Sequence, residues 1–126
     1  MEESVVGNIV EKKKTSLGLE ENVEGALCYV LGFVTGIVFL ILENDNKFVK
    51  FHAVQSIATF LPLTIIGSIV SSSMIWSFSM MWIGGILASV IFLIELFLWL
   101  LLMMKAFQGE KFKLPIVGDI AEKQSQ

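Results

Sequence analysis

The sequence has no arginine, one cysteine and one histidine, and each scarcity removes a class of function. All nine cationic side chains are lysines, so no guanidinium group is available for bidentate binding of phosphate or carboxylate. Together with a formal net charge of −3, this leaves nucleic-acid binding without support. Cys28 can form no internal disulfide, and we interpret it as a small buried apolar side chain.

Residues that could act in catalysis or bind a metal are equally few. His52 has no second histidine or cysteine at ligand spacing, so we expect it to bond to lipid headgroups or to Glu43 rather than to a metal. No nucleophile motif and no glycine-rich phosphate loop is present. The sequence therefore predicts no enzymatic activity, no cofactor and no metal site.

Apolar residues, in contrast, make up 55% of the chain, and the mean hydropathy is +0.76. Most of them lie in three runs, residues 25–42, 53–70 and 82–104. At about 1.5 Å per residue the first run would extend roughly 27 Å, close to the thickness of the hydrocarbon core. The pattern predicts an all-α membrane protein with three transmembrane helices.

The three runs also predict the domain organisation. Residues 1–18 are polar and mixed in charge, which indicates a flexible N-terminal tail. Residues 19–113 are expected to form the transmembrane domain, and residues 114–126 a C-terminal tail.

Three spans would place the N-terminal tail and the second loop on one side of the membrane, and the first loop and the C-terminal tail on the other. The first side would carry three lysines and the second side six. Because lysines accumulate on the cytoplasmic side, we expect a cell-membrane protein with a cytoplasmic C-terminus. The lysines of the two sides are Lys12, Lys13 and Lys14, against Lys47, Lys50, Lys105, Lys111, Lys113 and Lys123.

Glu95 is the main candidate for a functional residue, because it lies about 15 Å inside the third run, where a charge costs at least a few kcal/mol. Thr35 and Thr59 are each expected at a depth of roughly 10 Å and are the candidate partners of Glu95. Three roles are open: a protonated glutamate hydrogen-bonded across helices, a transport or proton-relay group, and a contact for lipid or peptide.

The start of the second run combines basic and aromatic side chains with a polar stripe. We expect an amphipathic surface segment at Lys47, Phe48, Lys50 and Phe51, leading directly into the second span. On that span, His52, Gln55 and Ser56 share one face and would form a polar groove descending from the cytoplasmic surface.

Small residues predict where helices pack closely. Gly32 and Gly36 form a GxxxG pair in the first run, which would allow another helix to approach. Gly84 and Ala88 fall within about 40° of Glu95 on a helical projection, so the small-residue face of the third run also carries the acid.

Three segments together resemble a known family: residues 27–32 (LCYVLG), 46–56 (NKFVKFHAVQS) and 115–119 (PIVGD). They resemble an uncharacterised family of small archaeal and bacterial membrane proteins, which is similar to the Tic-twenty proteins of the chloroplast inner-envelope import translocon. The resemblance covers roughly residues 15–123. It implies a helical membrane protein involved in moving or inserting polypeptides.

Three hypotheses of function follow. The first is a component of polypeptide translocation or membrane insertion, which contacts the lipid bilayer and a polypeptide client and acts as a homo-oligomer or within a larger membrane complex. The second is a small-solute or ion transporter that uses Glu95. The third is a membrane-shaping structural protein, whose surface segment at residues 47–52 wedges into one leaflet.

Overall fold

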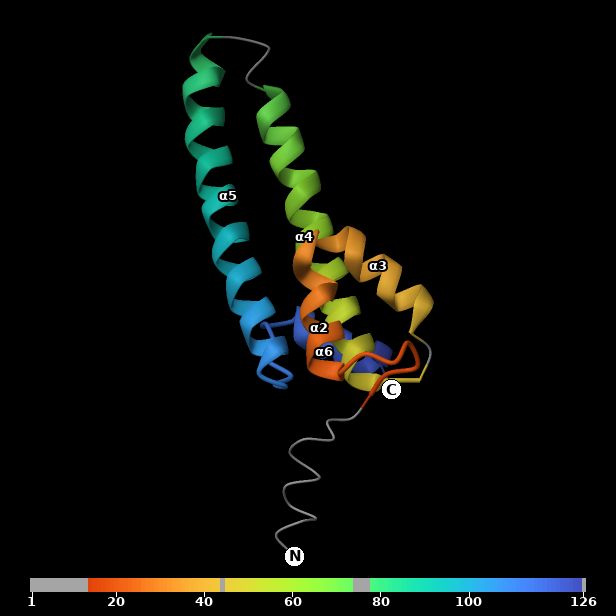
Figure 1. Ribbon diagram of the computed structural model, residues 1–126. Coiled ribbons are helices and arrows are strands. Elements are labelled where there is room, and N and C mark those ends of the chain that lie inside the picture. The colour runs from red at the N-terminus through yellow and green to blue at the C-terminus, as the bar shows by residue number, and fades with distance from the viewer. Residues whose placement is uncertain (1–13, 44, 74–77, 126) are drawn as a thin grey trace, which may run out of the picture.

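The computed structural model describes residues 14–43, 45–73 and 78–125, and these residues are helical apart from turns and one isolated bridge between Lys14 and Glu20. Two short helices come first and are followed by two long ones and a short C-terminal helix (Figure 1). In chain order they are α2 (Glu21–Val30), α3 (Phe33–Leu42), α4 (Lys47–Ser73), α5 (Phe78–Phe107) and α6 (Val117–Ser125).

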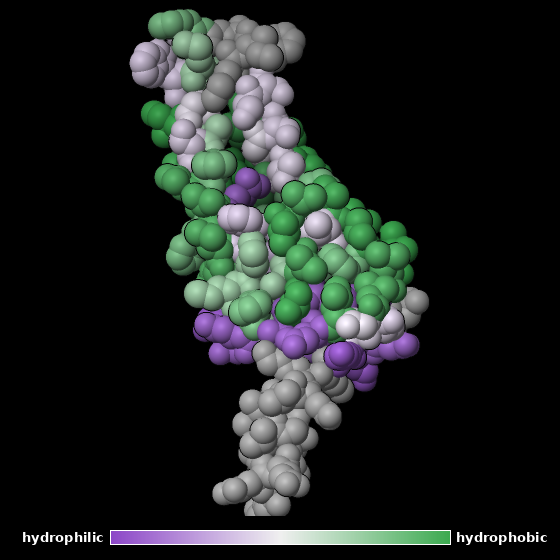
Figure 2. Space-filling view, in the orientation of Figure 1, coloured by the Kyte–Doolittle hydropathy of each residue, from purple (hydrophilic) through white to green (hydrophobic). Residues whose placement is uncertain are grey.

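Helices α4 and α5 are the two helices of the described chain that are long and apolar enough to cross a membrane. They contain 27 and 30 residues, or about 40 and 45 Å of helix. Only 6% of the most apolar stretch of α5 is buried inside the protein. Figure 2 shows the resulting band of apolar surface, and a band of this size points to lipid as the surrounding solvent.

The first predicted span is not a single helix. It is divided at Leu31 and Gly32 into α2 and α3, each ten residues long, or about 15 Å, half of the hydrocarbon thickness. The chain turns at Gly32, whose φ of +62° is a conformation that side chains other than glycine rarely adopt. Helix α2 runs away from the N-terminal end and α3 returns beside α4, so the pair forms a helical hairpin (Figure 1).

Side chains from the long helices bind the backbone groups that this break releases. The Trp99 indole Nε1 donates to the carbonyl of Tyr29 at 2.7 Å, and the Ser56 hydroxyl donates to the carbonyl of Gly32 at 2.8 Å. Within the hairpin, the Thr35 hydroxyl donates to the carbonyl of Cys28 at 3.0 Å. A broken helix is tolerated at membrane depth when protein groups satisfy its backbone in this way.

The N-terminal residues and the first loop lie at the same end of the molecule, which corrects the predicted topology. The Ser16 hydroxyl donates to the Glu43 carboxylate at 2.7 Å, and the Asn22 amide donates to the carbonyl of Phe107 at 2.8 Å. The hairpin is the cause, because it returns the chain to the side from which it started. We call this end, where the charged side chains gather in Figure 2, the charged end.

The C-terminal segment expected as a tail contains α6, which packs against α4. An ion pair between Lys113 and Glu122 joins α6 to the segment before it. Of the predicted N-terminal tail, residues 1–13 lie outside the described residues. Thr15 is buried, and its N–H donates to the carbonyl of Leu19 at 2.8 Å.

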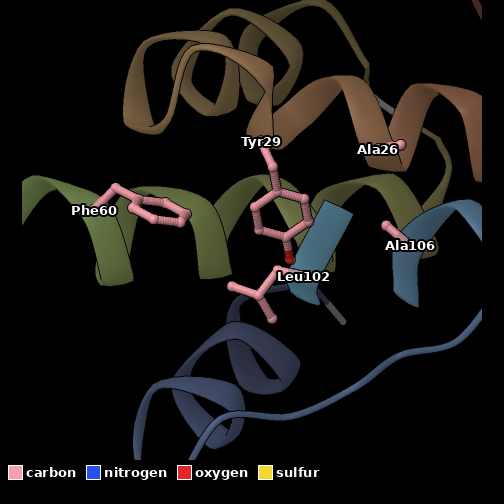
Figure 3. Close-up of a cluster of buried hydrophobic side chains, with 5 residues drawn as sticks. All are labelled: Ala26, Tyr29, Phe60, Leu102 and Ala106. Atoms are coloured by element: carbon pink, nitrogen blue, oxygen red, sulfur yellow. The ribbon is translucent and has the colours of Figure 1, made fainter. Parts of the chain in front are cut away.

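The hydrophobic core lies in the half of the molecule nearest the charged end. Tyr29 of α2 points between Phe60 of α4 and Leu102 of α5, and Ala26 and Ala106 complete the cluster (Figure 3). The Tyr29 and Phe60 rings meet edge to face with their centroids 6.4 Å apart. Farther from the charged end, α4 and α5 contact only each other among the described helices.

Candidate functional site

Glu95 lies on the side of α5 that faces α4, between two adjoining hollows. The hollow nearer the charged end has a volume of about 240 Å³ and reaches Leu31 and Gly32 at the hairpin turn. The other has a volume of about 310 Å³ and reaches Ser71. Both are lined by Thr64, Phe92 and Glu95, and we call them together the α4–α5 groove.

The polar neighbour of Glu95 in the groove is Thr64, which lines both hollows together with it. The Glu95 Oε1 atom is buried and has no hydrogen-bond partner among the described residues. Thr64 is exposed, so the groove opens onto the apolar outer surface. The α4–α5 groove is therefore mainly apolar, lies on the side of the protein and contains one acidic group, Glu95.

Neither of the expected partners forms a hydrogen bond with Glu95. The Thr35 hydroxyl is bonded within the hairpin, and the Thr59 hydroxyl is buried without a partner among the described residues. A comparison of depths along the two helices would have identified Thr64 from the sequence. Thr64 lies about 18 Å along α4 from His52, and Glu95 lies at a similar depth, about 15 Å along α5 from Lys105.

Of the two predicted packing residues on α5, one lines the α4–α5 groove and the other is buried. Ala88 lines the hollow that reaches Ser71, and Gly84 is buried one turn further along α5. Gly36 packs against α4, because a Cβ atom there would lie 2.9 Å from the carbonyl oxygen of Ala53. Gly32 belongs to the hairpin turn and not to a continuous GxxxG face.

The predicted polar stripe does not form a groove, because His52, Gln55 and Ser56 are fully buried. The Tyr29 hydroxyl lies 2.7 Å from His52 Nδ1, and His52 Nε2 lies 3.1 Å from the carbonyl oxygen of Glu110. These three residues therefore hold the hairpin and the segment before α6 onto α4. Headgroup contact by His52 is excluded by its burial.

Gln55 is the centre of this polar network. Its amide nitrogen donates to the carbonyl of Phe112 at 2.8 Å and to the Tyr29 hydroxyl at 3.2 Å. Its amide oxygen accepts from the N–H of Leu114 at 3.1 Å. One side chain thus joins α2, α4 and the connection between α5 and α6.

The predicted amphipathic surface segment is the first part of α4, and its aromatic residues face inward. Phe48 and Phe51 are 8% and 0% exposed, and the Lys111 ammonium lies over the Phe51 ring, 5.7 Å from its centroid. Lys47 is exposed and Lys50 half-buried at the charged end. The aromatic side chains are buried because α2 and the segment before α6 cover this turn of α4.

Glu43 stabilises the start of α4 instead of binding His52. Its Oε1 atom accepts hydrogen bonds from the N–H groups of Asp45 and Asn46 at 3.2 and 3.1 Å. Burial alone would raise the pKa of Glu43, but the hydrogen bonds from Ser16, Asp45 and Asn46 outweigh it and lower that pKa below its usual value.

The sequence has relatives of similar length in archaea. A UPF0132 membrane protein of Methanocaldococcus jannaschii is 51% identical over 113 residues, which cover 90% of this chain and 96% of the relative. A UPF0132 membrane protein of Archaeoglobus fulgidus is 43% identical over 106 residues, which cover 84% and 96%. No solved structure matches the chain.

These relatives and the two long apolar helices agree on a helical membrane protein. A family profile matches residues 20–121, which include every described helix up to the middle of α6. The chain therefore belongs to the magnetosome magnetite crystal formation protein family.

Proposed function

We propose that this protein is a component of polypeptide insertion or translocation that binds an apolar helical segment in the α4–α5 groove. The observation that carries the proposal is the Glu95 Oε1 atom, which is buried in the groove without a hydrogen-bond partner among the described residues. A polar group at this depth gains most from a partner within the membrane. A client helix with a hydroxyl or amide side chain would supply that partner.

The shape of the molecule supports a lateral site rather than a pore. Two crossing helices and a hairpin that reaches about half-way cannot enclose an aqueous channel, so translocation would need several copies or a larger membrane complex. The comparisons support the membrane protein family, and the finer Tic-twenty resemblance expected from the sequence is part of this proposal. Both the oligomer and the polypeptide client are parts of this proposal.

The other two hypotheses have less support from the geometry. A transporter that uses Glu95 would need a path from the charged end, but the packed network of Tyr29, His52 and Gln55 fills the protein there. A membrane-shaping role would need aromatic side chains in the leaflet, and Phe48 and Phe51 are buried instead.

Site-specific photocrosslinking tests the groove. A photoreactive residue at Phe92, which lines the groove, should crosslink to newly made transmembrane segments in native membranes. The same residue at Val90, which is exposed on another face of α5, is the matched control and should give several-fold less product. Glu95→Ala should reduce the Phe92 product. Equal yields at the two positions, both insensitive to Glu95→Ala, would contradict the proposal.

We also propose that the charged end faces the cytoplasm. All nine lysines lie outside residues 51–104, and the segment between α4 and α5 contains none. In a Cys28→Ala background, single cysteines at Ser16, Asp45 and Gln124 should react with an impermeant thiol reagent only after the membrane is opened. A cysteine at Ser72 should react in intact cells. Labelling of positions 16 and 72 from the same side would restore the three-span topology.

A further inference from the structure

Four buried oxygen atoms near the start of α2 have no hydrogen-bond partner among the described residues. They are both carboxylate oxygens of Glu24, the hydroxyl oxygen of Thr15 and the amide oxygen of Asn22. The Glu24 side chain is 0% exposed and Thr15 is 7% exposed. Because an ionised carboxylate without a partner in such a place costs several kcal/mol, Glu24 is either protonated or neutralised by a bound positive species.

A second carboxylate stands beside Glu24. Glu43 lies near enough for its charge to act on Glu24, and it is itself fully buried. Its Oε1 atom accepts the bonds from Asp45 and Asn46, whereas Oε2 accepts one bond, from the N–H of Ser16 at 3.1 Å. Burial and the neighbouring charge of Glu43 raise the pKa of Glu24. When both groups are ionised, the pair has two negative charges and unused acceptor atoms.

We propose that a hard divalent cation of the Mg²⁺ or Ca²⁺ class binds between Glu24 and Glu43, with the Thr15 hydroxyl as a further ligand. All of these donor atoms are oxygen, which is the ligand type that such cations prefer. Two carboxylates balance the charge of a divalent ion. No group of three or more histidine, cysteine or acidic side chains converges in the described part of the chain, so water completes the coordination.

A cleft of about 680 Å³ at the charged end provides access, because it is lined by Thr15 and by Ser16, whose hydroxyl is bonded to Glu43. Glu21 and Asp45 add negative charge to its wall, and Lys14, Lys47 and Lys111 add positive charge. A bound cation would join three segments, namely the residues before α2, α2 itself and the connection between α3 and α4. It would thereby hold the open end of the hairpin together.

Titration with Mn²⁺, followed by electron paramagnetic resonance, tests the site on the full chain in detergent after chelator treatment. We expect one Mn²⁺ per chain, displaced by Mg²⁺ or Ca²⁺. Glu24→Gln should weaken binding at least about tenfold, because even outer-sphere partners of a metal contribute about that much. Thr15→Val should weaken it by a smaller factor. Glu110→Gln, at an exposed carboxylate, is the matched control and should bind as the wild type does.

Two results would overturn the cation site. One is Mn²⁺ binding that Glu24→Gln leaves unchanged while circular dichroism shows a folded variant. The other is a folded wild-type protein that binds no Mn²⁺, which would mean that the two carboxylates share a proton. Because the readout is ion binding, its failure is distinct from failure of the crosslinking test at Phe92.

Discussion

Replacement of Gln55 by leucine is expected to lower the free energy of unfolding more than any other single polar substitution in this protein. The change leaves the N–H of Leu114 and the carbonyl of Phe112 without their partner. It also removes one of the two hydrogen bonds of the Tyr29 hydroxyl, which keeps its bond to His52 Nδ1. Each buried group left unpaired costs about 1–3 kcal/mol, so with two such groups we expect a loss of at least about 2 kcal/mol. Unfolding in detergent micelles, followed by circular dichroism during titration with a denaturing detergent, measures it.

The matched control for this prediction is the same substitution at Gln108, whose side chain is exposed just beyond the end of α5. Gln108→Leu should change the free energy of unfolding by less than about 0.5 kcal/mol. Limited proteolysis gives a second readout, because the loss of Gln55 should release the segment before α6 from α4 and expose it to cleavage. Equal stability of the two variants would show that the Gln55 network does not hold the fold.

The long helices could be predicted from hydropathy, but the hairpin could not. Residues 53–70 and 82–104 lie inside α4 and α5, since an apolar run that long has few alternatives to a spanning helix. Residues 25–42 are equally apolar, yet the chain turns at Gly32. Hydropathy reports where a segment partitions and not its φ angle, so a glycine that packs and a glycine that turns look alike in the sequence.

The roles of the polar residues were harder to predict because their partners are far away in the chain. Gln55 bonds to residues more than fifty positions later, and His52 bonds to the carbonyl of Glu110. Helical spacing placed His52, Gln55 and Ser56 on one face, but spacing alone does not reveal whether water or protein covers that face. Residues 46–56, one of the segments that carry the family resemblance, thus hold the hairpin and the segment before α6 onto α4.

Glu95 was found by its depth, and that argument needed only the sequence. Its partner was missed because Thr35 and Thr59 were placed by distance along single helices, without a register between α4 and α5. The hairpin turn also makes Thr35 unable to serve as the partner of Glu95, since the Thr35 hydroxyl caps the broken end of α2. A buried acid can thus be located from one helix, whereas its surroundings depend on how two helices are aligned.

Alanine at Gly36 and alanine at Gly67 are expected to have opposite effects, although both glycines lie in apolar helices. At Gly36 the added Cβ would lie 2.9 Å from the backbone oxygen of Ala53 and 3.1 Å from Ser56 Cβ, so α3 must move away from α4. Overpacking of this kind costs about 1–3 kcal/mol, and a backbone oxygen cannot rotate aside, so we expect a loss near 3 kcal/mol. Crosslinking between cysteines placed on α3 and α4 would fall as the helices separate.

At Gly67 the added Cβ would meet only Ile91 Cγ2, at 3.7 Å, which is an ordinary contact. Alanine also reduces the conformational freedom of the unfolded chain, so Gly67→Ala should leave stability unchanged or raise it by up to about 1 kcal/mol. Unfolding of the two variants in the same micelles gives the comparison. Equal tolerance of alanine at both positions would mean that α3 does not lie against α4, and the hairpin would then have to be replaced by a continuous first span.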